Sequence, residues 1–361
     1  MTEKSVLKIV ENCIPSMRRS RQKTLSAAIY GSVKNPMGKL TSMARGMGGD
    51  TQIRDRLKRL SRFVGNTSVQ IEETGRHLLQ WLIGRQGPLL PLVVLMDWTE
   101  EHDQFVLLFS VKWRKRSLPF YWYSAGKKEF YRSQNSIEYT AIRLIQSWVP
   151  EGQRMTLIAD RGFARSRLFQ MLKKLGIDFI VRIPKTTHLI SRKHRGSLAS
   201  VGLVEGKIQD VRNAVLGLDA KVPVRMVMKK AKIEGKLTRW FLATSLTGER
   251  KESIVSLYER RMGIEATFKD LKTTLGWRFQ NAIREPQRLA RYLLILVMSI
   301  IVALITSERK STHTILRWVS LHKAFRGTEP VSFVQLGLWM IQSIADQLSM
   351  IHPRKLPSYA L

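Results

Sequence analysis

The chain has 361 residues, 44% of them hydrophobic, so it can form two or three domains with cores, and a globally disordered protein is excluded. Its 61 Lys and Arg residues outnumber 28 Asp and Glu residues, giving a formal net charge of +33. This excess favours nucleic acid as the partner, with an anionic membrane surface second. A single cysteine, Cys13, excludes an internal disulfide framework and is typical of a reducing compartment.

Residues 1–85 are rich in helix formers and basic side chains, and Met1–Pro15 predicts the start of a polar amphipathic helix rather than the core of a signal peptide. Lys39–Arg62 predicts a helix, a glycine-rich turn and a second helix, as in a helix-turn-helix or a small helical bundle. We interpret 1–85 as a helical DNA-binding region, although two solvated basic helices would show the same pattern. Its candidate phosphate contacts follow one another along the second helix: Arg54, Arg56, Lys58, Arg59 and Arg62.

Residues 86–185 follow a linker containing glycine and proline and predict a mixed α/β core, with helices packed on a central sheet. Short apolar runs indicate the strands, and apolar residues at helical spacing indicate the helices. The expected strands are Leu92–Met96, Phe105–Lys112, Arg116–Ser124, Met155–Ala159 and Asp178–Ile183, and the expected helices are Ser136–Ser147 and Ser166–Gly176.

Residues 186–248 show alternating patterns, most clearly in Val222–Met228 and Lys236–Ala243, and predict a β-rich insertion. A helical pattern resumes at Ile254 and continues, with breaks, to about Gln347, across the regions 249–310 and 311–361, and the segment after Pro353 is expected to be loose. Within it, Tyr292–Thr306 is a run without charge. Because a membrane span needs about 20 apolar residues, this run favours a buried helix.

Two of the predicted strands lead directly into a carboxylate: Leu92–Met96 precedes Asp97, and Met155–Ala159 precedes Asp160. Such positions often carry function, but an Asp after a strand also commonly starts a turn or caps a helix. Other acids follow Asp97 closely, and we favour Asp97 because it directly ends the apolar run. Those other acids are Glu100, Glu101 and Asp103. The histidines do not show a convincing metal-binding spacing; they are His102, His188 and His194.

A third acid, Glu265, lies in a predicted helix with Tyr258, Arg261 and Lys272. At 100° per residue, all four positions fall within about 60° of one another. A solvated face with ion pairs would explain the charges but not the tyrosine. The mixture suits phosphoryl transfer on DNA, in which carboxylates hold two hard cations and basic side chains hold phosphates.

The spacing Tyr258-x2-Arg261-x3-Glu265-x6-Lys272 resembles the Y-R-E-K signature of bacterial DDE transposases, and the chain is similar to the insertion-sequence-four family. The segments VLMDWTE around Asp97 and LIADRGFA around Asp160 resemble the two other acidic motifs of that family. The 105 residues between Asp160 and Glu265 leave room for the β insertion that the family places within a ribonuclease-H-like fold.

The resemblance implies an α/β, ribonuclease-H-like catalytic core in two parts, 86–185 and 249–310, between N-terminal and C-terminal helical regions. It implies that Asp97, Asp160 and Glu265 bind two Mg²⁺ ions, which Mn²⁺ could replace. Strand nicking, a DNA hairpin, its opening and strand transfer would follow. Tyr258, Arg261 and Lys272 would hold phosphates, and Trp240 would stack on an extruded base unless it is simply a core residue of its strand.

The partners implied are double-stranded DNA, as terminal inverted repeats and target, and a second copy of the chain in a synaptic homodimer formed through 311–361. No membrane or small-molecule substrate is expected, and the location would be the bacterial cytoplasm, at the nucleoid. Two alternatives stay open: a metal-dependent nuclease without strand transfer, and a DNA-binding protein with an inactive site.

Overall fold

The computed structural model describes residues 1–87, 91–113, 116–233, 236–307 and 332–342. The chain divides into two compact units. The first comprises Met1–Leu78, Glu101–Gln104 and the described part of Thr267–Leu361, and the second comprises Leu79–Glu100 and Phe105–Ala266. The division into five regions expected from the sequence stays a prediction.

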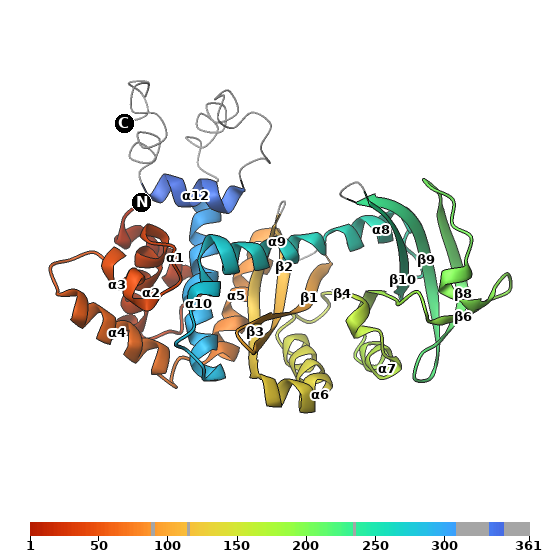
Figure 1. Cartoon of the computed structure of the whole chain (residues 1–361), viewed down its shortest axis with the longest axis horizontal. Coiled ribbons are helices and arrows are strands. Elements are labelled where there is room, and N and C mark those ends of the chain that lie inside the picture. Colours follow the sequence, from red (N-terminus) through yellow and green to blue (C-terminus); the bar gives the residue numbers. More distant parts are fainter. Residues whose placement is uncertain (88–90, 114–115, 234–235, 308–331, 343–361) are drawn as a thin grey trace, which may run out of the picture. The chain divides into compact units, whose positions relative to one another are not determined.

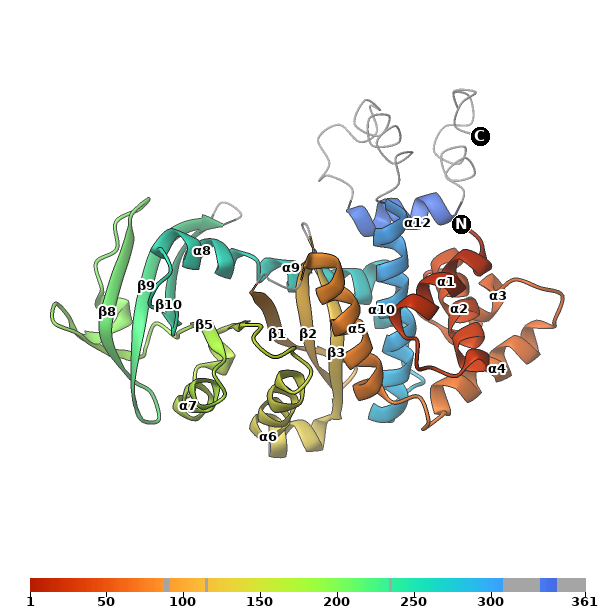
Figure 2. The ribbon, with the colours of Figure 1, turned by 180° about the vertical axis from the view of Figure 1, so that it is seen from behind.

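The first unit is helical. Its central element, α10 (Pro286–Ser307), contacts α2, α4 and α12, and Figure 2 shows this helix in blue beside them. α10 is long and apolar enough to cross a membrane, but 94% of its most apolar window is buried, as in the core helix of a soluble protein. Its companions are α1 (Glu3–Cys13), α2 (Arg19–Lys34), α3 (Leu40–Gly46), α4 (Ile53–Gly65), the start of α5 (Ile71–Gln86) and α12 (Phe333–Ile341).

The helix, turn and helix expected over Lys39–Arg62 are present as α3 and α4. α3 packs on α2 at a close backbone crossing of Gly31 and Gly46, where a Cβ atom on Gly46 would lie 2.5 Å from the carbonyl oxygen of Gly31. Only glycine allows this approach. The N-terminal helices therefore form a small bundle, and its contact with DNA stays a prediction.

The second unit is built on one ten-stranded sheet, in the order β3-β2-β1-β4-β5-β10-β9-β8-β6-β7. β1, β4 and β5 are parallel neighbours at its centre, and all five residues of β4 are buried. The strands are β1 (Leu92–Glu101), β2 (Gln104–Trp113), β3 (Arg116–Gly126), β4 (Met155–Ala159), β5 (Asp178–Arg182), β6 (His188–Ile190), β7 (Arg195–Ser197), β8 (Ile208–Gly217), β9 (Lys221–Ile233) and β10 (Lys236–Thr244).

The β-rich segment predicted over 186–248 is present as β6–β10, and it continues the central sheet. β10 pairs antiparallel with β5, with Leu242 opposite Arg182 and Thr244 opposite Ile180. The segment is therefore joined to the core by a ladder of backbone hydrogen bonds as well as by its ends. Its identity as an insertion into a ribonuclease-H-like core stays a prediction.

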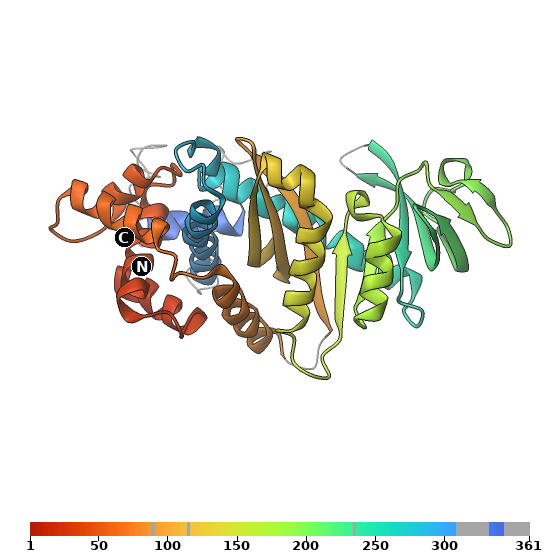
Figure 3. The same cartoon turned by 90° about the horizontal axis from the view of Figure 1, so that it is seen from below.

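Helices cover both faces of the sheet. Figures 1 and 3 show α6 (Lys127–Gln146) and α7 (Ser166–Lys174) on one face, and Figure 1 shows α8 (Lys251–Glu259) on the other. α6 begins nine residues before the predicted start at Ser136. Its added first turns carry Phe130, which stacks on Phe105 of β2 with ring centroids 4.0 Å apart.

The continuous helix expected from Tyr258 to Lys272 is wrong. α8 ends at Glu259, a turn occupies 260–261, and α9 covers Met262–Lys269 before a π-helical turn at Asp270–Thr274. The assumed 100° per residue therefore fails at two points, because neither the turn nor the wider π-helix keeps the spacing of 3.6 residues per turn.

The predicted C-terminal helical region, 311–361, lies largely outside the described residues. Only α12 and its two flanking residues, Ser332 and Gln342, are described there. α12 packs on α10 within the first unit, and a Cβ atom on Gly337 would lie 1.9 Å from the carbonyl oxygen of Ala303.

Candidate active site

The two candidate aspartates lie side by side because β1 and β4 pair in parallel. The pairing runs from Leu92 opposite Met155 to Met96 opposite Ala159, so Asp97 and Asp160 occupy the next position in each strand. Asp97 does not end its strand as expected, since β1 continues to Glu101. What ends at Asp97 is the pairing with β4, which leaves both carboxylates at the edge of the parallel ladder.

The third acid reaches this place from the opposite end of the second unit's sequence. Arg261, in the turn between α8 and α9, donates a hydrogen bond of 2.7 Å to Asp97 Oδ2 and one of 2.5 Å to Glu265 Oε1. Its Nη2 atom also lies 3.7 Å from Asp160 Oδ2. One guanidinium therefore joins three carboxylates, which we call the acidic triad (Asp97, Asp160 and Glu265).

Burial and the repulsion between the carboxylates both raise the pKa of Asp97 in the triad. Burial raises the pKa of Asp97 to about 6, Arg261 lowers it, and the nearby carboxylates of Asp160 and Glu265 raise it. Burial would lower the pKa of Arg261, but the surrounding acidic groups raise it well above its usual range. The guanidinium therefore stays charged, as a counter-ion for groups that would otherwise repel one another.

Tyr258 and Trp240 form the wall beside Asp160. The Tyr258 hydroxyl donates to Asp160 Oδ1 over 3.2 Å, and burial raises the pKa of this phenol. The Trp240 ring meets the Tyr258 ring edge to face with centroids 5.2 Å apart. Trp240 is only 4% exposed, so stacking on an extruded base would first require its face to be uncovered.

Lys272, the fourth residue of the expected stripe, belongs to the first unit, whereas the acidic triad belongs to the second. Its ammonium lies 3.5 Å from Glu101 Oε2 and 5.9 Å from the centroid of the Trp277 ring. Its expected role beside the triad therefore stays a prediction.

The competing acids have other surroundings. Glu101 pairs with Lys272, and Asp103 stands with His102 in the hairpin turn between β1 and β2, where both residues have positive φ. His194 contacts the carbonyl oxygen of Ser197 in its own β-hairpin. Across the described parts of the chain, no three His, Cys, Asp or Glu side chains are grouped closely enough to hold a metal as they stand.

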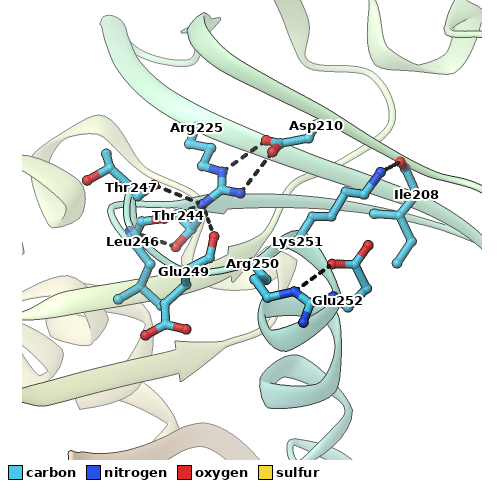
Figure 4. A network of polar contacts seen from close by, with 10 residues as sticks. All are labelled: Ile208, Asp210, Arg225, Thr244, Leu246, Thr247, Glu249, Arg250, Lys251 and Glu252. Atoms are coloured by element: carbon cyan, nitrogen blue, oxygen red, sulfur yellow. Dashed lines mark hydrogen bonds and ion pairs between the residues drawn. The ribbon is translucent and has the colours of Figure 1, made fainter.

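A buried arginine holds the turn that leads into α8, and Figure 4 shows it between two strands and this turn. Arg225 of β9 is 2% exposed and donates to both carboxylate oxygens of Asp210, over 2.9 and 2.8 Å. It also donates to three carbonyl oxygens of the turn, those of Leu246 (2.7 Å), Thr247 (3.3 Å) and Glu249 (2.7 Å). The β-rich segment therefore fixes the start of the helix that carries Tyr258.

The predicted phosphate contacts on α4 divide into two groups. Three of them line a groove together with two arginines near the start of α2, and Asp55 lies in the same groove. We call it the basic groove, and its cations are Arg18, Arg21, Lys58, Arg59 and Arg62.

The other two predicted contacts, Arg54 and Arg56, do not line the groove. Arg54 is exposed, and Arg56 instead donates to the carbonyl oxygens of Met47 and Gly49, which fixes the turn between α3 and α4. The sequence did hold a signal for the two arginines that were missed, since Arg18 and Arg21 belong to a short basic cluster that ends at Lys23.

Residues 135–302 match the family model described as transposase DDE domain. The match includes Asp160 and Glu265 together with Tyr258 and Arg261, and it begins after Asp97. A comparison with curated proteins finds no significant match. The family match supports a DDE transposase, with DNA as its substrate.

Proposed function

We propose that this chain is a cut-and-paste DNA transposase that cleaves the ends of an insertion element and joins them to target DNA. The single observation that carries the proposal is the convergence of the acidic triad on Arg261 at the edge of the parallel β1–β4 ladder. The transposase DDE match over 135–302 supports the same reading.

The triad offers the ligands that Mg²⁺ prefers, namely carboxylate oxygens from three separate segments. Asp97, Asp160 and Glu265 would hold two Mg²⁺ ions, and Mn²⁺ would substitute. Bound there, the ions would activate the attacking hydroxyl and stabilise the leaving oxygen of each phosphoryl transfer. In the structure these carboxylates share one cationic partner, Arg261, and this contact supports the assignment of the triad to cation binding.

The neighbouring side chains have roles that follow from their contacts. Tyr258 holds Asp160 through its hydroxyl, and Arg261 is a charged fork of the kind that binds phosphate oxygens. We assign both to positioning the scissile phosphate group, and Lys272 to holding a phosphate further along the strand. Trp240 is assigned to an extruded base in a hairpin step, which requires its buried face to open.

The basic groove is assigned to the terminal inverted repeats. Five cations from α4, α2 and the residue before α2 line it with a single acid, Asp55, so an anionic backbone is the partner whose charge fits. Synapsis of two element ends would require a homodimer. The protein would act in the cytoplasm, where its DNA substrate lies.

The test is incubation of purified protein with a labelled element end, Mg²⁺ and a target plasmid. Strand-transfer products with the wild type support the proposal. Cleavage without joining would identify a metal-dependent nuclease, and binding without cleavage would identify a DNA-binding protein with an inactive site. Either of these two results overturns the transposase assignment.

A further inference from the structure

A second buried acid, Glu138, lies outside the acidic triad. It stands on α6, is 0% exposed, and accepts hydrogen bonds from three side chains. Trp98 Nε1 donates to Oε1 over 2.8 Å, Gln134 Nε2 donates to the same oxygen over 3.1 Å, and Arg165 donates to Oε2. Burial raises the pKa of Glu138, and Arg165 is the main influence that lowers it.

Two of these donors come from the segments that carry the candidate aspartates. Trp98 directly follows Asp97 on β1, and its backbone amide donates to Asp97 Oδ1 over 2.9 Å. Arg165 follows Asp160 after a single 3-10 turn, and the backbone amide of Phe163 in that turn donates to the carbonyl oxygen of Asp160 over 3.0 Å.

The position of Glu138 matters because the β1–β4 ladder stops at Met96 opposite Ala159. Beyond that pair, the two aspartate segments share no register with each other. The Glu138 carboxylate contacts both of them beyond this point, with one oxygen toward Trp98, two residues after Met96, and the other toward Arg165, six residues after Ala159. α6 also holds Trp98 through Phe130, whose ring meets the indole edge to face with centroids 4.8 Å apart.

Energetics favour a directional role over a packing role. Burying a carboxylate costs several kcal/mol unless charge and hydrogen bonds offset it, and an apolar residue would fill the same volume at less cost. What an apolar residue cannot do is fix the Trp98 indole and the Arg165 guanidinium at a set separation. Glutamine cannot replace this function, because only one of the two carboxylate oxygens would remain as an acceptor. Its NH2 group would face one of the two donors, the Trp98 indole or the Arg165 guanidinium.

We propose that Glu138 is a positioning residue that sets the separation of Asp97 and Asp160 by gripping the segment after each. It is proposed to act through Trp98 and Arg165. The inference rests on the proposed function for its consequence, which is that the separation of the two aspartates affects the binding of divalent cations. We call the two contacts of Glu138, with Trp98 and with Arg165, the grip. These contacts belong to the folded chain, and their effect is measurable without catalysis.

The first experiment measures hydrogen–deuterium exchange of the metal-free protein. Glu138→Gln is expected to speed exchange in both segments, 97–101 and 160–166. The matched control is Glu129→Gln. Glu129 lies on the same helix, and its carboxylate accepts a hydrogen bond of 2.7 Å from the Tyr123 hydroxyl. Unchanged exchange in both segments of a folded Glu138→Gln protein overturns the grip, whatever the protein does to DNA.

The second experiment measures Mn²⁺ affinity by calorimetry, alongside binding to an element end. Glu138→Gln is expected to weaken Mn²⁺ binding by about 10- to 100-fold, the usual effect of losing a partner that orients metal ligands, with DNA binding unchanged. Ile145→Val, a cavity mutation on the same helix, controls for general destabilisation. Wild-type Mn²⁺ affinity in folded Glu138→Gln overturns the positioning role.

If Glu138→Gln fails to fold, Trp98→Phe keeps an aromatic ring at this position, although a smaller one, and removes the indole donor to Glu138. It is expected to speed exchange in 97–101 and to weaken Mn²⁺ binding; no change in either overturns the proposal. Wild-type protein that binds no Mn²⁺ and leaves DNA intact would refute the proposed function, while the exchange experiment would still decide whether Glu138 grips the two segments.

Discussion

Arg261 contacts all three carboxylates of the acidic triad, so the effect of replacing it can be worked out from the structure. Replacing it with glutamine would leave the acidic triad in place without its shared cation. The Arg261 side chain is 11% exposed, and those of Asp97 and Asp160 are 20% and 26% exposed, so water can screen the remaining repulsion only in part. We therefore expect Arg261→Gln to destabilise the metal-free protein.

The size of the effect follows from exposure. Glu265 is 55% exposed, and a pair with so much solvent contributes at most about 1 kcal/mol. The contact with Asp97 is more buried, and removing one partner of a buried pair costs about 3–5 kcal/mol. Because Asp97 keeps the hydrogen bond from the Trp98 amide, we expect the low end, about 3 kcal/mol.

The loss should depend on pH. The pKa of Asp97 is raised from 3.8 to about 6 on folding, so its stabilising contribution is present below the unfolded value and is lost as the pH rises through 6. Arg261 lowers this pKa, so in Arg261→Gln it lies above 6 and the loss with rising pH extends further. The variant should differ most from the wild type near about pH 8 and least near about pH 5.

The assay is urea unfolding in EDTA at both pH values. The matched control is Arg260→Gln, which removes an equal charge from the neighbouring, exposed residue. A further arm adds Mg²⁺, which should restore more stability to Arg261→Gln than to the wild type, because a divalent cation replaces the missing charge. Equal stability of Arg261→Gln and Arg260→Gln near about pH 8, or a loss of stability that does not vary with pH, would contradict the role of Arg261 as the counter-ion of the acidic triad.

Four further outcomes are expected. Alanine at any member of the acidic triad should abolish cleavage in the labelled-end assay and leave end binding within about twofold, because the basic groove is untouched; normal cleavage by one variant would remove that residue from the triad. Arg225→Met should lower the free energy of unfolding by about 3–5 kcal/mol, because the Asp210 carboxylate and three carbonyl groups lose their hydrogen-bond donor. A change under about 1 kcal/mol in urea unfolding would contradict this. Arg59→Gln should reduce the slope of log affinity against log salt by about 0.9, whereas an unchanged slope would place Arg59 outside the DNA contact. Trp240→Ala should impair hairpin formation more than first-strand nicking, and equal effects on gels would favour a core role.

Strong local signals made much of this arrangement predictable. The apolar runs before Asp97 and Asp160 mark β1 and β4 because a strand buried on both faces has no polar alternation. The three residues Tyr258, Arg261 and Glu265 do meet at these strands. The sequence predicted that these three residues lie together, but the continuous helix from which this was argued is interrupted at 260–261, and Arg261 reaches the acids from that turn.

The features that were missed depend on contacts between distant segments. Nothing in the sequence near Glu138 indicates that one buried carboxylate would join Trp98 to Arg165, because the three residues meet only once α6 lies on the sheet. The continuation of the central sheet through β10 was equally hidden, since alternation predicts strands but not their neighbours. The π-helical turn that includes Lys272 interrupts the helical period on which the prediction was based, and sequence periodicity does not reveal such a turn.

The parallel register of β1 and β4 has a consequence for how this protein can vary between species. The interval of 63 residues from Asp97 to Asp160 includes the loop between α6 and β4, and this loop can gain or lose residues without moving either carboxylate or Glu138. One residue inserted within the five-residue strand β4 would instead turn Asp160 to the opposite face. Relatives should therefore differ freely in the length of this interval and keep the phase of each strand. A search for them should weigh the distance from the first buried strand residue to the aspartate, and disregard the distance between the aspartates.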